Sequence, residues 1–106
     1  MTDTTMVRNL NDQFRQSFSG GRVMLTCGIA QRDDTATIVE RVKRFSDFTE
    51  DNDPHGEHDF GAFDHAGDKI FWKIDYYDRD LQSGSPDPTD PEATTRVLTI
   101  MLAGEY

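Results

Sequence analysis

Residues 51–61 hold the densest group of side chains that could do chemistry. Asp53, His55, His58 and Asp59 fall within seven positions, and a proline and a glycine restrict the backbone between them. Imidazole and carboxylate ligands at such short spacings suit zinc, manganese or iron bound by a loop. One hypothesis is therefore a metal-binding protein or a metal-dependent hydrolase that uses these four residues and a divalent metal as its cofactor.

The same cluster has a purely structural interpretation. Asp51 and Asp53 suit an Asx-type turn, and Pro54 and Gly56 suit the entry to a strand. His58 is then an imidazole held by neighbouring side chains, and the cluster is a clamp within the fold. Because no motif of established metal-ligand spacing is present, the sequence leaves both interpretations open. Outside the metal hypothesis we expect no cofactor.

His58, Asp59 and Asp75 are candidates for a general acid/base group. They would form one if a hairpin brought His58 diagonally close to Asp75. The sequence contains no nucleophile or cofactor motif that would complete such a site. Whether the chain is an enzyme stays open, and the missing motifs favour a protein that is not one.

The net charge comes from the second half of the chain. Residues 1–50 carry seven basic and seven acidic side chains, whereas residues 51–106 carry four basic and thirteen acidic ones, which accounts for the formal net charge of −9. Such a surface repels nucleic acid and anionic membranes and attracts a protein with a basic surface, including a nucleic-acid-binding complex. The residues expected to form the partner-binding surface are Asp75, Tyr77, Asp78, Asp80 and Asp87.

Length and composition bound the class of protein. A chain of 106 residues buries one modest core, so we expect a single domain over residues 1–106. The single cysteine, Cys27, excludes an intramolecular disulfide. No apolar run approaches the roughly 20 residues that span a bilayer, and the first residues lack a basic-then-apolar signal region. We therefore expect a cytoplasmic protein.

The elements that must position these residues follow from apolar periodicity. Apolar residues at helical spacing predict a helix over 5–18 that ends at Ser19-Gly20-Gly21, and a second helix over 33–45. Alternating apolar residues predict a strand over 22–30, with Cys27 on its buried face. We expect this thiol to be buried and unreactive.

Residues 58–65 and 69–78 alternate as two strands of a hairpin joined by a tight turn at Ala66-Gly67-Asp68. If Gly67 and Asp68 are the two central residues of the turn, Phe63 lies opposite Trp72. A slip of one residue would exchange the two faces of the strand, so the register decides which side chains meet.

The C-terminal part of the chain is predicted as a helix. Asp90-Pro91-Glu92 is typical of a helix start, with a capping side chain, a proline and an acidic residue in order. Residues 95–102 are also compatible with a fully buried strand, and the cap decides for the helix. The expected fold is a small α+β domain in the order α-β-α-β-β-α, with helices packed on a three-stranded, largely antiparallel sheet.

Three segments carry a resemblance to a known family: TEDNDPHGEHDFG at 49–61, FWKIDYYD at 71–78 and TRVLTIML at 95–102. The chain resembles, over nearly its whole length, a family of small bacterial proteins defined only as a domain of unknown function, DUF3768. The family supplies no activity, cofactor or catalytic residue. Its members are often carried on plasmids and phages, so the resemblance implies a small acidic binding protein of a mobile genetic element. Such a protein could inhibit a host nucleic-acid-targeting defence system, in the manner of an anti-CRISPR or anti-restriction protein.

Overall fold

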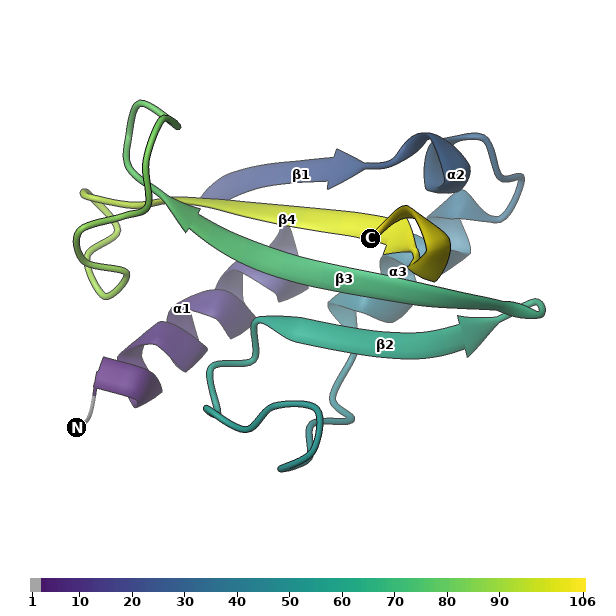
Figure 1. The fold of residues 1–106 in the computed structure, drawn as a ribbon, viewed down its shortest axis with the longest axis horizontal. Helices are drawn as coiled ribbons and strands as arrows, with labels where there is room; N and C mark the ends of the chain where they lie inside the picture. Colours follow the sequence, from purple (N-terminus) through teal and green to yellow (C-terminus); the bar gives the residue numbers. More distant parts are fainter. Residues whose placement is uncertain (1–2) are drawn as a thin grey trace.

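Four strands form one mixed sheet in the order β1-β4-β3-β2. The computed structural model describes residues 3–106, and its strands are β1 Gly21–Leu25, β2 Phe60–His65, β3 Asp68–Tyr77 and β4 Thr95–Leu102. β1 runs parallel to β4, whereas β3 is antiparallel to both of its neighbours. Figure 1 shows the strands side by side in this order, with β1 and β2 at the two edges.

Two helices cover one face of this sheet. α1 spans Asp3–Ser17 and α3 spans Thr35–Lys43, and both lie behind the strands in Figure 1. Between β1 and α3 is the short helix α2, Cys27–Ala30, and after β4 comes the 3-10 helix η1, Ala103–Glu105. The buried core between helices and sheet consists of Phe14, Ile29, Ile38, Val42, Ile70, Trp72, Ile74, Leu98 and Ile100.

The two predicted long helices are confirmed as α1 and α3. α1 ends before Phe18, which has a positive φ of 58° ahead of the predicted Ser-Gly-Gly stop. Its buried face is rotated from the expected stripe, because Asn11 is fully buried while Met6 is 38% exposed. A polar residue therefore lies at the centre of the helix–sheet contact, where the sequence pattern suggested only apolar ones.

The predicted C-terminal helix is wrong, because residues 95–102 form β4, the strand between β1 and β3. Hydrogen bonding to a strand on each side satisfies its backbone, and Leu98 and Ile100 are buried against the helices. The predicted cap does form locally, since Asp90 Oδ1 accepts a hydrogen bond from Glu92 N at 2.9 Å. It closes a turn there, and the sheet has four strands in place of the expected three.

The strand predicted over 22–30 ends early. β1 stops at Leu25, and Thr26 N donates the next ladder bond to Ile100 O at 3.1 Å before the chain turns into α2. Cys27 is exposed at the start of this helix, so the prediction of a buried thiol is wrong. The alternation of apolar residues in the sequence runs on to Ile29, but the backbone leaves the sheet after Leu25, so the pattern overstated the length of the strand.

The predicted hairpin is confirmed, but β2 begins at Phe60, so His58 and Asp59 lie before the strand that was expected to contain them. Its register also differs by two residues. Phe63 pairs with Ile70 and Gly61 pairs with Trp72. A side chain at Gly61 would collide with the Trp72 indole, so the glycine makes room for the largest core residue. The turn consequently centres on Ala66 and Gly67, both with positive φ. The shift of two leaves every side chain on its predicted face.

Within residues 3–106, none of the helices combines the length and the apolar character needed to cross a lipid bilayer.

Candidate functional site

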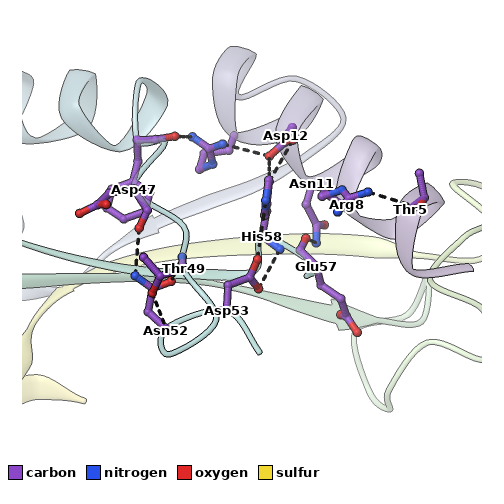
Figure 2. Close-up of polar contacts among 12 residues, drawn as sticks. Thr5, Arg8, Asn11, Asp12, Asp47, Thr49, Asn52, Asp53, Glu57 and His58 are labelled. Atoms are coloured by element: carbon purple, nitrogen blue, oxygen red, sulfur yellow. Dashed lines mark hydrogen bonds and ion pairs between the residues drawn. The ribbon is translucent and has the colours of Figure 1, made fainter. Parts of the chain in front are cut away.

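His58 lies between two carboxylates from different parts of the chain. Its Nδ1–H donates to Asp12 of α1, with the two carboxylate oxygens at 2.9 and 3.1 Å. Its Nε2 lies 3.6 Å from Asp53 Oδ2, and its backbone N–H donates to Asp53 Oδ1 at 3.2 Å. Figure 2 shows the imidazole between Asp12 on the helix and Asp53 on the loop.

An aromatic contact completes the environment of this imidazole. The Phe48 ring stacks on His58 with 3.7 Å between the ring centres, and Phe48 in turn meets Trp72 edge-on. The backbone of His58 has φ 56°, which is sparsely populated for a residue with a side chain. Such strain persists where surrounding contacts hold the residue. His58 therefore clamps the 44–59 loop to α1.

The structure brings together only two of the four residues of the metal hypothesis, Asp53 and His58, as neighbouring side chains. Asp53 and His58 are adjacent, but Asp12 and Asp53 approach opposite nitrogens of the imidazole, so the two carboxylates and the ring share no single point. His55 is exposed. Within residues 3–106 no group of three or more His, Cys, Asp or Glu side chains is arranged to hold a metal ion. Metal binding by Asp53, His55, His58 and Asp59 stays a prediction.

The proposed acid/base trio is divided between the two faces of the sheet. Asp75 is on the face of β3 turned away from the helices, because Ile74 and Tyr76 on either side of it point toward the core. His58 is on the helix side, packed through Phe48 against Trp72. The structure therefore does not bring His58 to Asp75.

A second polar network lies beside the His58 clamp and centres on Asn11. Asn11 Nδ2 donates to Glu57 O at 3.0 Å and to Tyr76 Oη at 2.8 Å, while its Oδ1 accepts from Arg96 Nε at 2.8 Å. Tyr76 Oη donates to Glu57 Oε1 at 2.9 Å. One buried amide thus connects α1, the 44–59 loop, β3 and β4.

Burial changes the acid–base chemistry of this region. It raises the pKa of the Tyr76 hydroxyl well above its usual range and lowers the pKa of the Arg96 guanidinium. Burial also raises the pKa of Asp59, and the negative charge of nearby Glu57 adds to the effect. Tyr76 is therefore a hydrogen-bonding group that keeps its proton. The ionised form of Asp59 is destabilised by its surroundings in the folded protein.

The opposite face of the sheet presents a groove. It has a volume of about 340 Å³. Asp75 and Tyr77, two of the predicted partner-binding residues, line it together with residues of β4 and the C-terminal turn. Lys73 Nζ lies 2.9 Å from Asp75 Oδ2, and this hydrogen bond raises the pKa of Lys73. The remaining lining residues are Thr26, Lys73, Val97, Thr99, Met101, Glu105 and Tyr106.

The other predicted partner-binding residues belong to the 78–94 loop, which continues from β3. Asp78 Oδ1 accepts a hydrogen bond from Gln82 N at 3.1 Å. Asp87 Oδ1 accepts from both Thr89 N and Thr89 Oγ1. Asp80 is exposed, and within residues 3–106 no cation or amide pairs with its carboxylate. Asp78 and Asp87 thus shape the loop, while Asp80 is available to a partner.

Comparison with protein families decides the relationship suggested by the three sequence segments. The model of the family described as "Protein of unknown function (DUF3768)" matches residues 4–105. The chain belongs to this family. Neither the curated proteins nor the solved structures compared with it include a match.

For this member of DUF3768, sequence reasoning missed the residues that organise the helix side of the sheet. Asn11 and Arg96 are buried, as is Arg15, whose guanidinium donates to Val42 O, Lys43 O and Phe45 O at the end of α3. Asp12 accepts from both His58 and Arg15. The available signal was the position of Asn11 and Arg15 one helical turn apart beside Phe14.

Proposed function

We propose that this DUF3768 protein is a non-enzymatic binding domain, and that it binds another protein through the sheet face turned away from α1 and α3. The observation that carries the proposal is the groove on that face, which places Asp75 and Tyr77 beside apolar and charged neighbours. By contrast, on the helix side His58 is bonded to α1, Glu57 to β3 and Asp53 to His58.

The composition of this face supports protein recognition. Tyr77, Val97 and the 75% exposed Tyr106 provide apolar contact area, and Lys73 and Asp75 provide paired charges around it. Met24 of the edge strand β1 is 54% exposed. An apolar centre with a polar rim is the usual composition of a protein interface.

The charge of the chain supports a partner with a basic surface. The 78–94 loop, next to the groove, contains five carboxylates and one arginine. Opposite charges on the two proteins would speed their encounter and make binding weaken as salt is raised. Exposed Asp80 and Glu92 are the loop carboxylates with no bond inside residues 3–106.

In its more specific form the proposal is an inhibitor of a host nucleic-acid-targeting complex, acting in the cytoplasm and encoded by a mobile genetic element. Its support is the family resemblance together with the net charge of −9, because proteins that bind nucleic acid present basic grooves. The general form of the proposal does not depend on it.

The test compares two charge reversals of equal size. The partner is first captured on the immobilised full chain from a host lysate, identified and purified. Its affinity is then measured for the wild type, for the loop variant Asp80→Lys/Glu92→Lys and for the control variant Asp33→Lys/Glu50→Lys. All four substituted carboxylates are exposed in the wild type.

The proposal expects the Asp80/Glu92 variant to bind at least about tenfold more weakly, and the Asp33/Glu50 variant to bind like the wild type. Tyr77→Ser should also weaken binding, because Tyr77 lines the groove. Equal affinities for all variants, or equal losses in both charge reversals, would refute a specific surface at this end of the sheet.

A further inference from the structure

Two adjoining cavities lie where β1 and β4 begin. The first has a volume of about 380 Å³ and the second about 240 Å³, and Gly20 and Thr94 line both. Although the chain carries a net charge of −9, no carboxylate lines either cavity. Three arginines do: Arg22 and Arg79 line the first, and Arg96 lines the second.

Arg96 is a buried cation without a direct counter-ion. Only 4% of the residue is exposed. Its Nε donates to Asn11 Oδ1 at 2.8 Å and its Nη2 to Pro88 O at 2.6 Å, and both acceptors are uncharged. Within residues 3–106 no group accepts a hydrogen bond from Nη1. A buried charge paired only with neutral groups is costly, and an anion in the cavity would offset that cost.

The other two arginines are also without acidic partners. Within residues 3–106 the guanidinium of Arg22 makes no hydrogen bond or ion pair, and that of Arg79 makes one long bond, from Nη1 to Pro91 O at 3.4 Å. Of the carboxylates in the 78–94 loop, Asp78 accepts from Gln82 N and Asp90 from Glu92 N. Among the described residues, neither arginine forms an ion pair with exposed Asp80 or Glu92. The guanidinium groups of Arg22 and Arg79 are therefore available to a bound oxyanion.

The second cavity has an apolar wall in addition to Arg96. Leu10, Phe14 and Pro91 line it together with Arg96. Gly21, which lines the first cavity, cannot carry a side chain, because a Cβ there would collide with Arg96 O and the Phe14 ring. Apolar and cationic surfaces side by side suit a ligand with an apolar body and an anionic end.

We propose that these cavities form a binding site for a small molecule that carries a phosphate or carboxylate group on an apolar body. The oxyanion is bound by Arg22 and Arg79, with Arg96 facing it from the buried side, and the apolar body packs on Leu10, Phe14 and Pro91. This site is separate from the groove proposed to bind protein, and it does not require that proposal.

The experiment titrates four probes into the isotopically labelled full chain and follows binding by NMR. The probes are phenyl phosphate, benzoate, inorganic phosphate and phenol. The site variant is Arg22→Gln/Arg79→Gln, and the control is Arg44→Gln/Lys69→Gln, which removes the same charge at exposed positions outside both cavities. Thermal melting confirms that both variants are folded.

The proposal expects phenyl phosphate or benzoate to bind more tightly than inorganic phosphate or phenol, with shifts at Thr95 and Arg96. The stronger of the two aromatic anions identifies the oxyanion. The site variant should bind it at least about tenfold more weakly, and the control should bind it like the wild type. Failure of both aromatic anions to bind at millimolar concentration, or an equal loss in the control, would overturn the proposal.

Discussion

The two long loops, residues 44–59 and 78–94, are both rich in carboxylates and contain proline and glycine, yet they use their carboxylates differently. The first contains six acidic residues and the second five. In the 44–59 loop Glu57 accepts a hydrogen bond from Tyr76 of β3, and the His58 imidazole donates to Asp12 of α1, while Asp53 accepts from His58 within the loop. The bonds of Glu57 and His58 fasten the loop to the body of the protein. In the 78–94 loop the bonded carboxylates accept hydrogen bonds from the loop's own residues.

This difference follows from the surface on which each loop lies. The 44–59 loop crosses the helix side of the sheet, where Asn11, Asp12 and Arg15 of α1 offer polar partners. The 78–94 loop joins two adjacent strands at the end of the sheet and closes on itself. An acidic, loop-forming sequence therefore does not by itself identify a binding surface, because its carboxylates can be structural.

The largest effect is expected at the amide shared by helix, loop and sheet. Asn11→Ala leaves Glu57 O, Tyr76 Oη and Arg96 Nε without their partner in a buried place. Since an unsatisfied buried polar group costs roughly 1–3 kcal/mol, we expect the free energy of unfolding to fall by about 3 kcal/mol. Urea denaturation measures it. Asn9→Ala, at an exposed position of the same helix, is the control and should change little.

The second largest loss of stability is expected at one of the two histidines of the 44–59 loop, His58, and not at the other, His55. His58→Ala removes the bond to Asp12 and the stack on Phe48, and we expect a loss of about 2 kcal/mol in unfolding free energy. His55→Ala, at an exposed position, should cost less than about 0.5 kcal/mol. Similar losses in the two variants would contradict the clamp.

Elemental analysis of the same purified proteins tests the metal hypothesis. One metal ion per wild-type chain that is lost in His58→Ala would make the cluster a metal site in addition to a clamp. If the wild type holds no stoichiometric metal and its melting temperature is unchanged by chelator, zinc or manganese, the four-residue metal site is excluded.

The smallest expected changes in stability come from one carboxylate in each loop, Asp59 and Asp87, and they depend on pH. Burial raises the folded-state pKa of Asp59, so its ionised form opposes folding, and Asp59→Asn should stabilise the protein at pH 7. Hydrogen bonds from Thr89 lower the pKa of Asp87, so its ionised form supports folding, and Asp87→Asn should destabilise the protein at pH 7.

Both differences should shrink as the pH falls. The gain from Asp59→Asn declines as pH falls through the raised pKa of Asp59, because protonation removes the buried charge in the wild type. The loss from Asp87→Asn is present above the ordinary aspartate pKa of 3.8 and disappears as pH falls through the lower folded-state value. Thermal melting between pH 7 and about pH 3 measures both, and effects of the same sign would contradict the assignment.

Features that depend on neighbours in the chain were determined by the sequence itself. The apolar spacing of α1 and α3 and the alternation of β2 and β3 are local patterns, so these elements and the faces of the hairpin could be predicted. The family relationship and the concentration of carboxylates after residue 50 are likewise properties of the sequence.

Features that depend on distant partners were decided only by the tertiary structure. Asp12 and His58 are 46 positions apart, and Asn11 and Arg96 are 85 apart, so no local pattern pairs them. Residues 95–102 became a strand because β1 and β3 flank them, although a cap precedes them. Long-range pairing satisfies a whole strand of backbone groups, and that outweighs the contribution of one capping side chain.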